Sequence, residues 1–240
     1  MAMLDRVRQL LPVPVRNVLR PIYNLVVGKH NAELDFWRSR HAIDGGRFRN
    51  DHYERILRAM AGEATSEFVA GKVIADFGCG PRGSLAWAAA ASFRIGIDVL
   101  APRYADEFTN SILSHGMVYV TSTEKTIPIP SDFVDVMFTL NAIDHVNDFR
   151  AMCSEIVRVI KPGGRLVASF NLEEPASSTE PQQLSEELIR QNLLNDFEVQ
   201  SYRITAPGPE EDLYRPFFEG LLPYTRGKEG FLWVSAIKPR

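Results

Sequence analysis

The chain has 240 residues, of which 45% are hydrophobic, 24% charged and 10% aromatic, with a net charge of −3 and a pI of about 6.0. This much apolar side chain excludes a disordered chain or a collagen-like repeat, and two cysteines, Cys79 and Cys153, are too few for a disulfide framework. The sequence has no run of about 18 apolar residues, the length needed to span a bilayer, so a globular protein of the cytoplasm is expected.

The N-terminal quarter differs in charge from the rest. Residues 1–60 carry 11 Lys and Arg against 6 Asp and Glu, whereas the remainder has a net charge of −8. The chain as a whole lacks the positive field of a nucleic-acid-binding protein, so no nucleic-acid partner is expected. Residues 1–30 form a basic amphipathic segment, with apolar side chains at helical spacing opposite Arg16 and Arg20.

Two interpretations of this basic segment stay open. Residues 1–28 could lie on an anionic membrane, which would place the protein peripherally at the inner face of the cytoplasmic membrane. Alternatively, their apolar stripe packs on the rest of the chain or on a second subunit, and the sequence does not fix the oligomeric state. Residues 31–70 are expected to form a cap of short polar helices, one of them running from an N-cap at Asp51 to Met60.

After Gly71, short apolar runs alternate with helical stretches, which is typical of a parallel sheet with crossover helices. The predicted strands are Val73–Phe77, Phe93–Ile97, Met117–Val120, Val134–Leu140 and Arg165–Phe170. The clearest helix spans Phe149–Ile160 and stops at Lys161–Gly164, and another is expected over Leu184–Leu194.

Two further runs, Phe197–Ile204 and Phe231–Ile237, have no clear helix between them, so they are expected to pair antiparallel at the sheet edge. The predicted fold is therefore α/β, a Rossmann-like doubly wound seven-stranded sheet with an antiparallel last strand and an N-terminal helical extension. We divide the chain into a basic segment (1–30), a helical cap (31–70) and a ligand-binding domain (71–240).

A glycine-rich loop follows the first predicted strand. Residues 76–83 read DFGCGPRG, which matches G-x-G-x-x-G, and Ser84 is expected to open an alanine-rich helix. Such a loop either cradles a nucleotide-like ligand or is only a tight connection. Asp98 ends the next strand 18 residues after Gly80, where a carboxylate can accept both hydroxyls of a ribose. This context favours a nucleoside site.

NAD and S-adenosylmethionine both carry a ribose, and charge beside the loop separates them. Asp76 would direct a carboxylate at the pyrophosphate of NAD, whereas the ammonium and sulfonium groups of S-adenosylmethionine are cations that a carboxylate favours. The antiparallel ending also differs from the usual dehydrogenase sheet. S-adenosylmethionine is therefore the predicted cofactor, and an NAD-dependent oxidoreductase is the first rival.

Five segments then occur in the order and at the spacing of the motifs of class I S-adenosylmethionine-dependent methyltransferases, which the sequence resembles over residues 71–240. They are Val73–Ser84, Gly96–Asp98, Ile127–Asp135 (IPIPSDFVD), Asn141–Val146 (NAIDHV) and Arg158–Gly164 (RVIKPGG). The resemblance implies an enzyme that transfers a methyl group from S-adenosylmethionine.

It also implies residue roles at the methionine end of the cofactor. Gly78 and Gly80 would let the backbone approach the ligand, with Cys79 between them acting through its small size. Asp76 would anchor the methionine part, and Asn141 would line this side of the pocket.

At the nucleoside end, the resemblance implies that Asp98 holds the ribose and that Val99 and Leu100 flank the adenine. The family often has an Asp that meets the adenine amino group, but Thr123 occupies that place here, with Glu124 beside it. Either side chain could serve.

The acceptor side rests on the segment after the fourth strand. His145 is a candidate general base for a hydroxyl, because imidazole titrates near neutral pH, or it is a structural histidine. Asp144 would bind substrate or cap the helix that starts near Asn147. The polar loop 171–181 is an acceptor-binding loop or a solvated connection.

The segment Asp76–Trp87, NAIDHV and the later Thr179–Pro181 are also similar to a subgroup of bacterial methyltransferases of surface-polysaccharide gene clusters. That similarity implies O-methylation of a sugar or glycan intermediate; the alternative acceptor is a small soluble metabolite. A noncatalytic nucleoside-binding module is a further rival. The histidines form no metal-ligand pattern, so no metal is expected.

Overall fold

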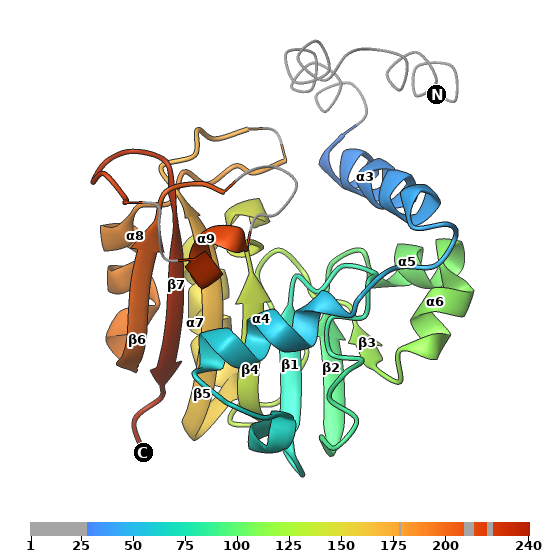
Figure 1. The fold of residues 1–240 in the computed structure, drawn as a ribbon, viewed down its shortest axis with the longest axis horizontal. Coiled ribbons are helices and arrows are strands. Elements are labelled where there is room, and N and C mark those ends of the chain that lie inside the picture. The colour runs from blue at the N-terminus through green and yellow to red at the C-terminus, as the bar shows by residue number, and fades with distance from the viewer. Residues whose placement is uncertain (1–27, 178, 209–213, 220–222) are drawn as a thin grey trace.

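The fold is a single seven-stranded sheet with helices on both faces (Figure 1). The computed structural model describes residues 28–177, 179–208, 214–219 and 223–240. The strands are β1 (Val73–Phe77), β2 (Phe93–Ile97), β3 (Val118–Val120), β4 (Val134–Leu140), β5 (Ile160–Leu172), β6 (Glu198–Thr205) and β7 (Gly230–Ile237). Their order in space is β3-β2-β1-β4-β5-β7-β6.

The first five strands pair in parallel, whereas β7 runs antiparallel between β5 and β6. The predicted fold class, with its antiparallel last strand, is confirmed. Several boundaries differ by one or two residues, and that of β5 differs most. This strand begins at Ile160 because the predicted stop at Lys161–Gly164 is part of it, with a register shift between Val134 and Val136 of β4.

Helices cover the two faces of the sheet and one of its ends (Figure 1). They are α3 (Lys29–Ile43), α4 (His52–Ala61), α5 (Ala101–Glu107), α6 (Thr109–Ser114), α7 (Phe149–Val159), α8 (Glu186–Asn192) and α9 (Arg215–Glu219), with short 3-10 turns η1 (Ser66–Val69), η2 (Ile143–His145) and η3 (Leu194–Asp196). Helices α7 and α8 pack on one face through the largest apolar core, and α4 packs on the other face against Phe138, Val167 and Trp233.

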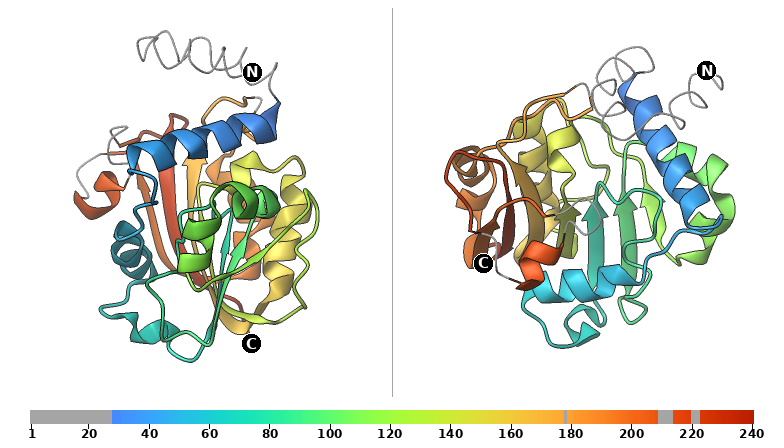
Figure 2. Two further views of the ribbon diagram at one scale, coloured as in Figure 1. Left: turned by 90° about the vertical axis from the view of Figure 1, so that its right-hand side faces the viewer. Right: turned by 45° about the horizontal axis from the view of Figure 1, so that its top comes forward.

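Helix α3 lies across the end of the sheet at which the parallel strands terminate (Figure 2). Its Leu34 is fully buried in a separate small core with Phe48, Leu100, Tyr104 and Phe108. Because these partners belong to α5, its flanks and the segment after α3, the helix is fixed beside the nucleoside end of the predicted site. The part of the chain that the structure describes contains no helix long and apolar enough to cross a membrane.

The prediction of an alanine-rich helix after Ser84 is wrong. Residues 84–92 form consecutive turns, in which the amides of Ala86, Ala88 and Ala91 each bond the carbonyl three residues earlier. The carbonyl of Ala90 instead accepts from Gly71, outside this segment. Tertiary bonding therefore outweighs the helix propensity of a short alanine run.

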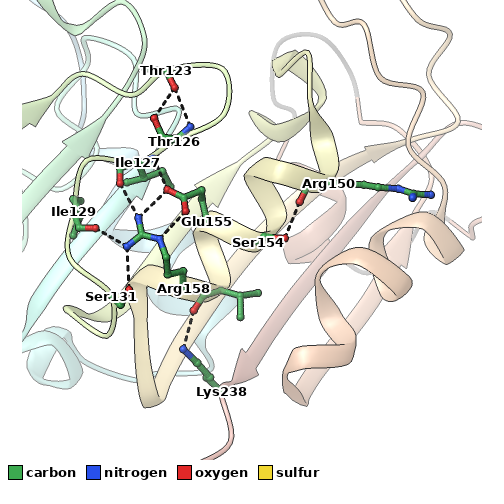
Figure 3. Close-up of polar contacts among 11 residues, drawn as sticks. Thr123, Thr126, Ile127, Ile129, Ser131, Arg150, Ser154, Glu155, Arg158 and Lys238 are labelled. Carbon is green, nitrogen blue, oxygen red and sulfur yellow. Dashed lines mark hydrogen bonds and ion pairs between the residues drawn. The ribbon is translucent and has the colours of Figure 1, made fainter.

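The loop between β3 and β4 is held by Arg158 at the end of α7 (Figure 3). Its guanidinium donates to the carbonyl oxygens of Ile127 and Ile129, each at 2.9 Å, and pairs with Glu155. A bidentate, multiply bonded guanidinium orders the backbone that it contacts. Arg158 thus fixes the loop between β3 and β4, which includes Thr123 and Glu124, to α7. The predicted basic segment, residues 1–30, lies almost entirely outside the described residues.

Candidate active site

A cavity of about 1110 Å³ opens at the carboxyl ends of the parallel strands. Its wall is formed by the glycine loop, by the ends of β2 and β4, by the loops that follow β3 and β5, and by α3. Open α/β sheets bind their ligands at this end, where the strand order reverses, which here is at β1 between β2 and β4.

The glycine loop forms the floor of the cavity. Asp76 is buried at the end of β1, and Ser84 donates a hydrogen bond to its carboxylate. The pKa of Asp76 is raised to about 7, because burial and the nearby charge of Asp98 outweigh the opposing effect of the bond from Ser84. Among the described residues this carboxylate has one side-chain hydrogen bond and no cation beside it, which makes it a suitable counter-ion for a cationic ligand.

The close contacts of the glycines differ from the prediction. A Cβ on Gly78 would lie 2.2 Å from the Cβ of Ala142, and one on Gly80 would lie 2.5 Å from the ring of Trp37. Gly80 does not line the cavity, so its small size serves the contact between the loop and α3. Cys79 packs on Gly96, where its sulfur leaves no room for a side chain.

Asp98 is buried at the end of β2, and its carboxylate already accepts hydrogen bonds from two backbone amides. One carboxylate oxygen accepts from the amide of Gly80 at 3.0 Å, and the other accepts from the amide of Leu100 at 2.8 Å. Each oxygen keeps a second lone pair that can accept from a ligand hydroxyl. Asp98 therefore joins the glycine loop to the predicted ribose position. Val99 lines the cavity beside it, whereas Leu100 is buried in the core under α3 and does not.

Both candidates for the adenine contact line the cavity, and both also bond protein groups. The hydroxyl of Thr123 bonds the hydroxyl of Thr126 at 2.7 Å and accepts from its amide at 2.9 Å (Figure 3). Glu124 accepts from the amide of Asn147 at 3.0 Å and forms an ion pair with Lys29 at 3.4 Å. Ser122, which the sequence did not single out, is buried and lines the cavity one residue earlier.

The segment after β4 brings the acceptor-side candidates together. Asn141 lines the cavity with a φ of 47°, and its side-chain oxygen accepts from Ser169 at 2.8 Å. The Nε2 atom of His145 lies 3.7 Å from an oxygen of Glu180, while its Nδ1 atom is buried without a hydrogen bond among the described residues. His145 thus presents an imidazole to the cavity with a carboxylate beside one nitrogen.

Asp144 does not cap the following helix. The N-cap of α7 is Asp148, whose carboxylate accepts from the amide of Ala151 at 3.1 Å. Asp144 is buried and accepts from Asn171 at 3.2 Å. Burial raises the pKa of Asp144. The nearby His145 lowers this pKa, and the charge of Glu180 raises it. The capping interpretation is therefore wrong; Asp144 ties the segment after β4 to the loop after β5, behind the cavity wall.

The polar loop after β5 closes over this segment. The side chain of Gln182 donates to the carbonyl oxygens of Val146 and Asn147 at 3.0 and 3.2 Å. Asn171, Glu174 and Glu180 line the cavity. The described part of the loop thus forms one wall of the site, as an acceptor-binding loop would.

Helix α3 supplies cavity residues that sequence reasoning missed. Lys29, Glu33 and Trp37 recur every four residues and all line the cavity. Their spacing was visible as one helix face. A polar face of that kind, however, is ordinarily solvent-exposed, so only its position over the sheet identifies it as part of a site.

Comparison with known proteins gives a family match for the central part of the chain. Residues 75–168 match a family model described as a methyltransferase domain. An uncharacterized methyltransferase from Mycobacterium sp. (strain JLS) is 30% identical over 111 residues, which are 45% of this chain and 42% of that protein. The chain thus aligns with less than half the length of this relative.

Solved structures show the same fold at low sequence identity. An S-adenosylmethionine-dependent methyltransferase from Mesorhizobium loti has a TM-score of 0.55 at 19% identity, over 77% of this chain and 96% of that one. A geranyl diphosphate C-methyltransferase from Streptomyces coelicolor, in complex with S-adenosyl-L-homocysteine, has 0.54 at 16%, over 78% and 77%. The [4+2]-cyclase SpnF has 0.56 at 19%, over 78% and 81%. The fold therefore hosts more than one reaction.

Proposed function

We propose that this chain, in which residues 75–168 form a methyltransferase domain on the class I fold, transfers a methyl group from S-adenosylmethionine to a hydroxyl of a sugar or glycan intermediate. One observation carries the proposal: the glycine loop and the candidate base His145 line the same cavity of about 1110 Å³. A donor on the loop and an acceptor at the imidazole would share one cavity.

The residues of the cavity fit the donor. Asp76 and Asp98 offer buried carboxylates to a ligand whose ammonium and sulfonium groups are cationic, and Asn141 and Val99 stand at the positions expected beside them. Asp76 would repel the pyrophosphate of NAD, whereas Asp98 could accept the ribose hydroxyls of either ligand. Calorimetric titration with S-adenosylhomocysteine and with NAD(H) separates the two cofactors, and binding of NAD(H) alone would overturn the donor assignment.

The chemistry required of the protein is alignment and proton removal. S-adenosylmethionine, when bound, supplies an electrophilic methyl group. His145 accepts the proton of the attacking hydroxyl through Nε2, since Nδ1 is buried, and the Glu180 carboxylate 3.7 Å from Nε2 stabilises the imidazolium that forms. Most of the acceleration comes from holding donor and acceptor in line within a pocket poor in water.

The acceptor end of the cavity is rich in oxygen atoms. Asn171, Glu174, Glu180 and Glu229 line it, and together they can accept hydrogen bonds from several hydroxyl groups. This pattern supports a polyhydroxylated acceptor. A small soluble metabolite is the second candidate, and comparing methyl transfer to nucleotide-linked sugars, lipid-linked glycans and free small metabolites by mass spectrometry distinguishes them.

Replacement of Asp98 by alanine is expected to weaken S-adenosylhomocysteine binding by about 1–3 kcal/mol, because the ribose hydroxyls lose a charged acceptor. The amide of Gly80 loses its partner as well, so the variant should bind more weakly than Asp98→Asn. Calorimetry on both variants measures the difference. Unchanged affinity in a folded Asp98→Ala protein would remove Asp98 from the site.

Donor-site affinity should depend on pH through Asp76, whose pKa lies at about 7. Below that pH the carboxyl is neutral and attracts a cation less, so S-adenosylhomocysteine should bind more weakly as pH falls from about 8 to about 6. In Asp76→Asn this part of the pH dependence should disappear. Equal pH profiles for the two proteins would show that Asp76 does not face the ligand's ammonium group.

We also propose peripheral membrane contact through residues 1–28, on the basis of their basic amphipathic sequence. Deleting them should abolish binding to anionic liposomes but preserve fold and donor affinity, because the described cavity is lined by residues from Lys29 onward. Sedimentation with liposomes and calorimetry check the two halves of this prediction. A truncated protein that aggregates would favour packing of this segment on the chain or on a second subunit.

A further inference from the structure

Helix α3 is anchored over the cavity at two points, one on each side of Glu33. Lys29 donates to the carbonyl oxygen of His145 and pairs with Glu124 at 3.4 Å. Two turns later, Trp37 packs on the glycine loop, so closely that a Cβ on Gly80 would lie 2.5 Å from its ring. Since residues four apart share a helix face, Glu33 is directed into the cavity between these anchors.

Glu33 is a carboxyl group that the fold does not use. Its pKa is raised to about 7, because desolvation and the charges of Asp98 and Glu124 outweigh the opposing effects of His145 and Lys29. In the part of the chain that the structure describes, no hydrogen bond reaches its side chain. Glu33 is half-buried in the cavity wall, so its carboxyl can accept hydrogen bonds from a ligand.

The charge that influences Glu33 most is Asp98, the predicted ribose acceptor. The two carboxyls line the same cavity but come from different elements, Glu33 from α3 and Asp98 from the end of β2. No Lys or Arg hydrogen bond to either carboxyl is present among the described residues. A ligand that satisfies both must therefore supply hydrogen-bond donors, and adjacent ribose hydroxyls do so.

We propose that Glu33 is a donor-binding residue, which accepts a hydrogen bond from the ribose of the donor opposite Asp98. This inference rests on the proposed use of S-adenosylmethionine. It places a part of the donor site on α3, outside residues 75–168 that match the methyltransferase domain. The donor is held between the sheet and the helix, so α3 contributes to donor affinity and not only to the cover of the cavity.

Calorimetric titration of Glu33→Ala and Glu33→Gln with S-adenosylmethionine and S-adenosylhomocysteine tests this assignment. Both ligands carry the same ribose, so Glu33→Ala should weaken both by roughly tenfold or more, the size of a hydrogen bond to a charged group. A loss confined to S-adenosylmethionine would overturn the ribose contact, because only that ligand carries the sulfonium charge.

The controls separate this inference from the proposed function. Glu54→Ala removes another helical glutamate, on α4 and outside the cavity, and should leave both affinities unchanged. The ligand-free Glu33→Ala protein should melt no lower than the parent, since the half-buried carboxyl accepts no hydrogen bond among the described residues. If the parent binds neither ligand, the proposed donor is wrong; if the parent binds and Glu33→Ala binds equally well, only the role of Glu33 is wrong.

Discussion

Replacing His145 by alanine is expected to lower the turnover of methyl transfer by roughly 10²–10⁴, the usual contribution of a positioned general base, while donor affinity stays nearly unchanged. The structure explains why the two effects should separate. Lys29 of α3 bonds the main-chain carbonyl of His145, which the substitution keeps, so the helix remains anchored over the cavity. Single-turnover methyl transfer and calorimetry on the same preparation measure both quantities.

Glu180→Gln is the companion variant. It removes the carboxylate charge 3.7 Å from Nε2 and should lower turnover less than His145→Ala does, since the imidazole can still accept the proton.

His115 shows what a structural histidine looks like in this protein: burial lowers its pKa to about 4, and its ring bonds Tyr119 at 2.8 Å beneath the glycine loop. If His145→Ala loses donor binding or stability, His145 is a structural histidine like His115 and not the general base.

Gly80→Val is expected to abolish measurable donor binding and to destabilise the fold. A branched residue at a φ of +55° costs about 1–3 kcal/mol. Its side chain would also overlap the ring of Trp37, and forcing extra atoms into a packed contact costs about 1–3 kcal/mol more. The displaced ring would lift α3 from the loop. Thermal unfolding and titration with S-adenosylhomocysteine measure the two losses.

Gly71→Val is the matched control, because Gly71 has a φ of +68° but nothing within 4 Å of an added Cβ. It should show the backbone strain without the loss of donor binding. Adding Trp37→Ala to Gly80→Val should restore room for the valine and part of the affinity. If the double variant still fails to bind while remaining folded, the valine meets the ligand itself, and the contact with α3 is not the reason for the glycine.

The donor side of the site was largely predictable because its signals are local in sequence. Asp76 lies at the end of β1, Gly78 in the loop that follows, and Asp98 directly after β2, so strand alternation alone brings them to one edge of the sheet. The adenine contact was not predictable in the same way. Thr123 and Glu124 both line the cavity, but only the structure shows that their side chains also bond Thr126, Lys29 and Asn147.

By itself, the sequence determined the strand pattern, the antiparallel ending and the motif residues at the carboxyl edge, because each is specified by periodicity or by residues within one turn. Only the tertiary structure decided that the run of alanines forms turns, that Gly80 faces Trp37 and that Glu33 enters the cavity. The positions of Gly80 and Glu33 depend on contacts between segments more than 40 residues apart. A polar helix face reads the same in sequence whether it meets water or a ligand, and the packing of Leu34 beside α5 determines which it meets here.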